Sequence, residues 1–204
     1  EGELAGEVFT KLGQKDYASE IAQIRASEAD SVFFFLPGGM GINFLKQYDQ
    51  AGLSQDVPVF GPAFSFDERI LNAVGEAALG VKNGAQWSPD LEVPANEAFV
   101  EAFVAEYDRR PTLYASQGYD AARLIGSALA ETGGDGDVAA LRKAIKAAEF
   151  DSVRGDFRFG TNNHPVQDLY VREVVAHEGG LTNKAVAKVF NDHVDAYAAD
   201  CPME

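Results

Sequence analysis

Blocks of apolar and polar residues follow one another along the first half of the chain in an order that predicts alternating strands and helices. Residues 3–10 predict a strand, and "DYASEIAQIRASEAD" after them predicts a helix with Asp16 as its candidate N-cap. Residues 31–36 predict a second strand. Its three consecutive phenylalanines do not alternate with polar residues, which favours a strand covered on both faces, as in a parallel sheet.

The same order then repeats. A helix is predicted from about residue 41 to 51, with Gly52 placed to end it. "VPVFGP" (57–62) predicts a third strand, and in the helix after it Ser65 and Glu68 have the spacing of a capping box. "GVKNGAQW" (80–87) predicts a fourth strand before the amphipathic "NEAFVEAFVAEYDRRP". Strands and helices joined by short loops predict an α/β fold with a mostly parallel sheet.

The pattern changes after Pro111. "LYASQGYDAARLIGSALAETGG" predicts one helix, and "DVAALRKAIKAAEF" predicts another that Asp137 caps. "GDFRFGTNNHPVQDLYVREVV" predicts two antiparallel strands around a polar turn. The final "NKAVAKVFNDHVDAYAAD" predicts a tail helix, one face of which carries Val186, Val189, Phe190, His193 and Tyr197.

Composition narrows the class of protein. The 204 residues can bury a sizeable core, as one domain or two small ones. A net charge of −15 argues against nucleic acid and against an anionic membrane surface as partners. Cys201 is the only cysteine, so the sequence supports neither an internal disulfide nor a zinc or thiol redox site. The first predicted strand follows Glu1 almost directly, and we therefore expect further residues upstream.

The stretch "SVFFFLPGGMG" outlines a strand that enters a helix through a glycine-rich loop. A dinucleotide fingerprint would need a third glycine where Phe44 stands, and no Lys-Ser/Thr pair follows that would make a P-loop. What remains is that Gly38, Gly39 and Gly41 let a ligand approach the backbone, and that a helix N-terminus favours an anion. The alternative is a tight strand-to-helix turn without a ligand.

Catalytic patterns are scarce. The three histidines, His164, His177 and His193, have no spacing that pairs them as metal ligands. Ser116 in "YASQG" lacks the nucleophile-elbow pattern, because Tyr114 stands in place of its first glycine. We therefore predict no catalytic residue, no metal and no cofactor, and a protein that is not an enzyme.

The order of segments resembles a known family. "FFFLPGGMG", "GINFLKQYDQAGL", "VPVFGPAFSFDE" and "VGEAALGVKNGAQWSPD" come first, followed by "PANEAFVEAFVAEYDRRPTLYASQGYDAARLIGSAL" and "FDSVRGDFRFGTNNHPVQDLYVREV". Over residues 3–175 this order is similar to the C-terminal part of a type I periplasmic binding protein of ABC importers, in the leucine/isoleucine/valine-binding class.

The resemblance implies a fold and a division of the chain. Members have two doubly wound α/β lobes joined by three crossovers, with the ligand held between them. Residues 1–108 match the second lobe without its first strand–helix unit. Residues 109–168 match the returning part of the first lobe, and 169–204 hold the last crossover strand and the tail helix. The partners implied are a small organic acid, a membrane permease and the missing N-terminal portion, in the periplasm.

The resemblance also implies a ligand class. In amino-acid-binding members, the loop after the "GP" strand carries an acid that pairs with the ligand ammonium, and Ala63 occupies that position here. A buried unpaired ammonium would cost several kcal/mol, which disfavours an α-amino acid. Phe35, Phe64, Phe66, Trp87 and Tyr114 suit a planar apolar body instead, and the chain most resembles the branch that takes up aromatic carboxylates such as benzoates or hydroxycinnamates.

The expected ligand-binding residues lie in loops at strand ends and at one helix start: Pro37, Gly38, Gly39, Met40, Ala63, Phe64, Ser65, Trp87, Tyr114 and Gln117. Phe35 and Trp87 also fit the core, and Asp67 and Glu68 fit helix caps better than ligand contacts. Two alternatives stay open: a branched-chain or other amino-acid-binding protein of the same fold, and a ligand-sensing domain or doubly wound enzyme.

Overall fold

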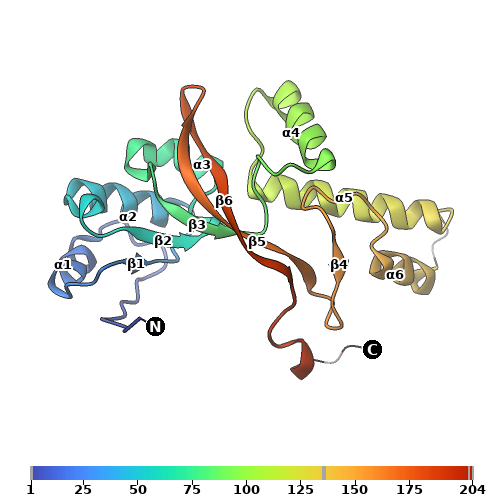
Figure 1. Ribbon diagram of the computed structural model, residues 1–204, viewed down its shortest axis with the longest axis horizontal. Helices are drawn as coiled ribbons and strands as arrows, with labels where there is room; N and C mark the ends of the chain where they lie inside the picture. The colour runs from blue at the N-terminus through green and yellow to red at the C-terminus, as the bar shows by residue number, and fades with distance from the viewer. Residues whose placement is uncertain (1, 135–136, 202, 204) are drawn as a thin grey trace. The chain divides into compact units, whose positions relative to one another are not determined.

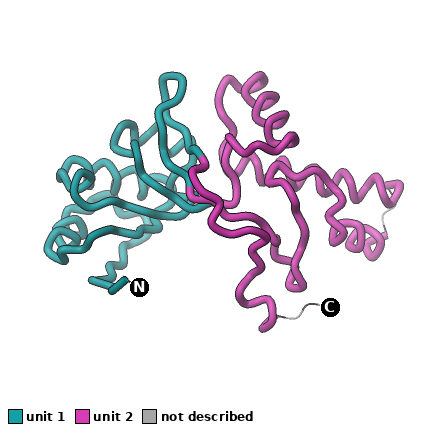
Figure 2. Tube along the Cα trace, in the orientation of Figure 1, with its two compact units in different colours: residues 1–85, 172–184 teal, residues 86–171, 185–204 magenta. Residues whose placement is uncertain are grey.

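The computed structural model describes residues 2–134, 137–201 and 203. The chain forms two compact units, and Figure 2 shows them in different colours. Unit 1 consists of residues 1–85 and 172–184, and unit 2 of residues 86–171 and 185–204. The chain therefore passes between the units at residues 85/86, 171/172 and 184/185.

Unit 1 is built on short parallel strands. β1 (Val32–Phe33) pairs with β2 (Val59–Pro62), and β2 pairs with β3 (Lys82–Ala85), both in parallel. β5 spans Pro165–His177, and its part in unit 1, from Arg172 on, lies next to β3. β6 (Gly180–His193) pairs with β5. The α/β fold with parallel strands that the sequence predicted is confirmed.

Three helices of unit 1 pack beside these strands (Figure 1): α1 (Ala18–Ala26), α2 (Gly39–Gln50) and α3 (Glu68–Val74). Their apolar faces and the strands bury an aromatic core, in which the Phe34 ring lies 4.9 Å from that of Phe44 and 5.3 Å from that of Phe66. Gly52 adopts a left-handed conformation directly after α2 and ends it, as predicted.

Three local predictions in unit 1 are wrong. Residues 3–10 form no strand, because no described strand pairs with their backbone, and Leu4 and Phe9 are exposed. The segment 31–36, which contains β1, is covered on one face only: Phe34 is buried, whereas Phe33 is 72% and Phe35 59% exposed. The capping box at the start of α3 is absent, since Asp67 is the N-cap and accepts a hydrogen bond from the Arg69 N–H.

The described residues of unit 2 form the α-helices α4 (Pro94–Tyr107), α5 (Leu113–Glu131) and α6 (Val138–Ala147). Asp137 caps α6 by accepting from the Ala139 N–H, as the sequence predicted. β4 (Arg158–Phe159) and β5 form the predicted antiparallel pair around a polar turn. α4 belongs to unit 2, which begins at residue 86, and the lobe boundary near residue 108 that the resemblance implied stays a prediction.

The predicted tail helix is also wrong, because residues 180–193 form strand β6. The turn at Glu178 and Gly179, both with positive φ, returns the chain along β5 and gives the segment a partner strand. The three-residue spacing of Val186 and Val189 fits one face of a helix, but pairing with β5 makes this segment a strand. The only helical residues after β6 in the described chain are the 3-10 turn Ala198–Asp200.

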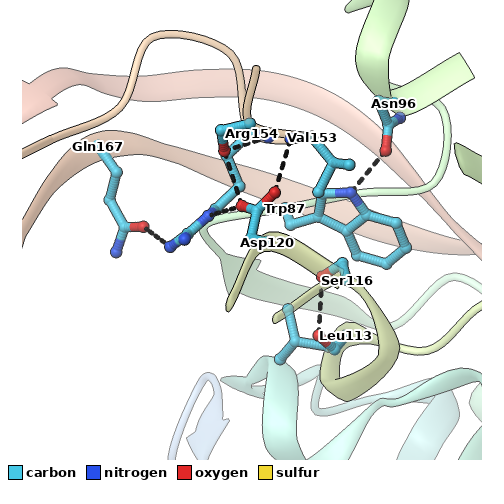
Figure 3. Close-up of polar contacts among 9 residues, drawn as sticks. Trp87, Asn96, Leu113, Ser116, Asp120, Val153, Arg154 and Gln167 are labelled. Carbon is cyan, nitrogen blue, oxygen red and sulfur yellow. Dashed lines mark hydrogen bonds and ion pairs between the residues drawn. The ribbon is translucent and has the colours of Figure 1, made fainter. Parts of the chain in front are cut away.

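A buried carboxylate organises unit 2. Asp120, on α5, is 2% exposed. Figure 3 shows it accepting from the Val153 N–H at 2.9 Å and from the Arg154 Nε at 2.9 Å. The Ser152 hydroxyl also donates to it, at 2.7 Å. Because each carboxylate oxygen has donors, the buried charge is compensated and fixes the 152–154 segment against α5.

Unit 1 has a buried cluster of its own, formed by Arg172, Asn83, Asn183 and Glu68. The Arg172 Nε and one terminal nitrogen donate to Asn83 Oδ1 at 2.9 and 2.7 Å. The Asn83 amide nitrogen donates to Asn183 Oδ1 at 2.8 Å, and the Asn183 amide nitrogen donates to Glu68 Oε1 at 2.9 Å. Burial raises the pKa of Glu68. The positive charge of Arg172 lowers this pKa again only in part, and the negative charge of Asp67 raises it further.

Replacing Asp120 by alanine should destabilise unit 2 strongly. The change leaves the Arg154 guanidinium and the Val153 N–H without their acceptor in the interior, a loss of about 3 kcal/mol in the free energy of unfolding. Urea denaturation measures it. Asp151→Ala is the control, because Asp151 and its partner Arg123 are 87% and 48% exposed and such a pair contributes about 0.5 kcal/mol or less. Equal losses in the two variants would contradict the role of Asp120.

Glu68→Gln should change how stability depends on pH. A raised pKa means that the folded state favours the protonated carboxyl, so the contribution of Glu68 is complete below its ordinary value of 4.5 and is lost as the pH rises through the raised value. A glutamine cannot ionise. The free energy of unfolding of Glu68→Gln minus that of the unmodified chain should therefore increase from about pH 4 to about pH 8. The exposed Glu76→Gln is the control, and a constant difference for Glu68→Gln would refute the argument.

Candidate functional site

The glycine-rich loop lies at the carboxyl end of β1 and leads into α2. Gly38 is the N-cap of α2, with φ 62° and ψ −135°, a conformation open only to glycine. Gly41 serves packing: a Cβ there would lie 2.3 Å from the Leu36 carbonyl oxygen. From the sequence, Gly41 was expected to let a ligand approach the backbone, whereas in the structure it lets the chain's own backbone approach.

Pro37 and Gly39 are the exposed residues of this loop, and the Met40 side chain packs partly against the core. The Met40 sulfur also accepts from the Gly13 N–H at 3.4 Å. The first turn of α2 has no side-chain cap. Its N–H groups therefore provide a partial positive charge that suits an anionic ligand group.

A second loop, residues 63–67, follows β2 and lies beside the first. The Leu36 N–H donates to Ser65 Oγ at 3.2 Å, which ties the two loops together. Ala63 is 2% exposed and Ser65 is fully buried. Phe64 meets Phe35 edge to face, with ring centroids 6.5 Å apart. The carboxyl ends of two adjacent parallel strands thus bring together seven of the expected residues: Pro37, Gly38, Gly39, Met40, Ala63, Phe64 and Ser65.

The buried cluster of unit 1 reaches this second loop. The Asn183 amide nitrogen donates to the Phe66 carbonyl at 2.8 Å, and the Asn183 N–H donates to Glu68 Oε1 at 3.2 Å. The loop is therefore held by Ser65 on one side and by Asn183 on the other. Sequence reasoning missed Asn83, Arg172 and Asn183, since the two asparagines are 100 residues apart and no spacing connects them.

Trp87, in unit 2, is a buried residue of the interior. Figure 3 shows its indole N–H donating to Asn96 Oδ1, at 2.7 Å, and its ring lies 6.4 Å from that of Phe99. Its side chain is fully buried. The structure thus places Trp87 in the packed part of unit 2 and not on an open rim.

Tyr114 and Gln117 lie in the first turns of α5. Thr112 caps the helix by accepting from the Ala115 N–H. The Tyr114 side chain is 53% exposed and Gln117 is partly buried. Ser116 is buried, and its hydroxyl donates to the Leu113 carbonyl, which is a structural contact (Figure 3). These two expected residues belong to a different unit from the glycine loop, and their place beside the same ligand stays a prediction.

The described part of the chain offers no cluster of three or more His, Cys, Asp or Glu side chains that could hold a metal ion. His164 lies 3.8 Å from Asp195, and His177 lies 3.5 Å from Glu178, each in a surface pair. Among the described helices, none is both long and apolar enough to cross a membrane.

Comparison with known proteins gives one consistent result. A family model described as periplasmic binding protein matches residues 1–180. The Leu/Ile/Val-binding protein homolog 6 of Brucella melitensis is 33% identical over 191 residues, which are 91% of this chain and 49% of that protein. Its counterpart in Brucella abortus matches equally. The chain thus spans about half the length of the curated relatives it matches.

Comparison with solved structures points to the same kind of protein. A solute-binding protein of an ABC transporter from R. palustris, in complex with benzoate, is 32% identical with a TM-score of 0.84, covering 96% of this chain and 52% of that one. Another, from Rhodopseudomonas palustris BisB5 in complex with 3,4-dihydroxybenzoic acid, is 34% identical with a TM-score of 0.79 and covers 89% and 50%. The resemblance stated from the sequence is confirmed, and the chain belongs to the type I periplasmic binding protein family.

Proposed function

We propose that the protein carrying this chain is the extracytoplasmic solute-binding component of an ABC importer and captures a small aromatic carboxylate of the benzoate or hydroxycinnamate kind. It would bind this solute without chemical change and deliver it to a membrane permease. Support comes from the R. palustris relatives described above and from two further solute-binding proteins, 28% and 29% identical, in complex with 4-hydroxybenzoate.

The observation that carries the proposal is the buried alanine at position 63. By the resemblance given above, Ala63 takes the place of the acid that amino-acid-binding members carry, and this buried alanine cannot balance an ammonium group. The ring of Phe64, the next residue, packs against that of Phe35, and the pair offers an apolar surface for an aromatic ring. The uncapped first turn of α2 favours the carboxylate of such a ligand.

The second candidate is a branched-chain amino acid, which the names of the curated relatives favour. It would require an acid to pair with the ammonium. The two carboxylates nearest to Ala63 in the sequence are already engaged: Asp67 caps α3, and Glu68 accepts from Asn183. The aromatic acid therefore suits the 63–67 loop better.

A panel of ligands distinguishes these candidates. Benzoate, 4-hydroxybenzoate and a hydroxycinnamate should raise the melting temperature of the protein carrying its upstream half, whereas leucine and valine should not. A ligand at ~100 times its dissociation constant adds about 2.7 kcal/mol to the free energy of unfolding, which a thermal melt resolves. A shift with leucine or valine alone would instead establish the amino-acid reading and refute the argument from Ala63.

Introducing the missing acid tests the same argument from the protein side. Ala63→Asp places an unpaired carboxylate where the proposed ligand's apolar ring would lie, and burying such a charge costs several kcal/mol, so aromatic-acid affinity should fall by about 100-fold or more. Ala63→Asn is the matched control, because it has the same shape without the charge. Isothermal titration calorimetry measures both dissociation constants. Equal losses in the two variants would show that size, and not charge, limits this position.

A further inference from the structure

The buried cluster of Arg172, Asn83, Asn183 and Glu68 is placed where unit 1 begins and ends along the chain. Unit 1 ends at residue 85, resumes at residue 172 and ends again at residue 184. Asn83, Arg172 and Asn183 thus stand within two residues of the three passages between the units. All three side chains are at most 3% exposed.

One member of this cluster contacts the 63–67 loop directly. The Asn183 amide nitrogen donates both to the Phe66 carbonyl and to Glu68 Oε1, at 2.8 and 2.9 Å. These two acceptors bracket Asp67, the N-cap of α3. Asn183 therefore fixes the end of the loop that begins with Ala63, while Leu36 fixes its middle through Ser65.

Burying the polar and ionisable groups of this cluster carries a desolvation penalty. Glu68 Oε2 and Thr182 Oγ1 are buried without a hydrogen-bond partner, and Glu68 and Arg172 are ionisable groups in a desolvated place. Apolar side chains of similar volume often stabilise such a site equally well. What they cannot supply is a directed amide donor that holds one backbone carbonyl in one conformation.

We infer that Asn183 is a positioning residue for the bound acid: its amide holds the Phe66 carbonyl and, with it, Ala63–Ser65 in the conformation that receives the ligand. This role rests on the proposed function, in which the 63–67 loop lines the ligand site. Asn183 acts through the loop backbone and does not itself touch the ligand. The cluster then links ligand affinity to β5 and β6, the two strands that pass from one unit into the other.

The test compares Asn183→Ala and the milder Asn183→Ser with Val74→Ala, in the protein carrying its upstream half. Val74 is a buried core residue at the far end of α3 from Glu68, so its truncation lowers stability without touching the 63–67 loop. Melting temperatures without ligand and dissociation constants for benzoate and 4-hydroxybenzoate are measured for all three variants. The Asn183 variants should bind these acids about tenfold more weakly, the order expected when a hydrogen bond that fixes a binding loop is lost.

Val74→Ala should lower the melting temperature and leave the dissociation constants unchanged. If the Asn183 variants behave like Val74→Ala, with lower melting temperatures and unaltered affinity, the cluster is purely structural and the inference is overturned. The proposed function is tested separately, by measuring which ligand the unmodified protein binds. If that protein binds leucine in place of the aromatic acids, the same variants are compared for leucine, and unaltered leucine affinity overturns the inference equally.

Discussion

The guanidinium of Arg172 is fully buried, and a guanidinium has only donors to offer. Two of its nitrogens donate to Asn83 Oδ1, so the Asn83 side chain must turn its amide nitrogen the other way, toward Asn183 Oδ1. That contact in turn directs the Asn183 amide nitrogen to the Phe66 carbonyl and to Glu68. One buried donor therefore sets the orientation of two amides and, through them, the backbone at the end of the 63–67 loop.

Unit 2 uses the opposite charge for the same purpose. The carboxylate of Asp120 offers only acceptors, and it gathers a hydroxyl, a backbone N–H and a guanidinium nitrogen from the 152–154 segment. In both units an ionisable group in the interior dictates which way its neighbours point. Such groups contribute little net stability compared with apolar packing, but they leave the surrounding loops a single arrangement.

Most features that depend on near neighbours were predicted from the sequence, although the capping box expected at Ser65 and Glu68 is absent. The cap at Asp137, the end of α2 at Gly52, and strands within 57–62 and 80–87 all follow from local patterns and are present. Features that depend on a distant partner failed: residues 3–10 lack a strand to pair with, and residues 180–193 found one in β5. The candidate site likewise contains one part that the sequence predicted and one part that it did not. Its loops were located because parallel strands place their carboxyl ends together, whereas the cluster behind them joins residues 100 positions apart.

The composition of the 63–67 loop explains why its anchors are polar. Ala63 and Ser65 carry too little side chain to fix a backbone by packing, and the proposed aromatic ligand would require a small residue at position 63. A loop of this kind would be mobile unless hydrogen bonds at Ser65 and at the Phe66 carbonyl held it. Under the proposed function, a loop held by these hydrogen bonds would lose little conformational entropy on binding, and more of the interaction energy would be available as affinity. In that proposal, the space for the ligand and the rigidity of the loop would both follow from small residues held by a directed polar cluster.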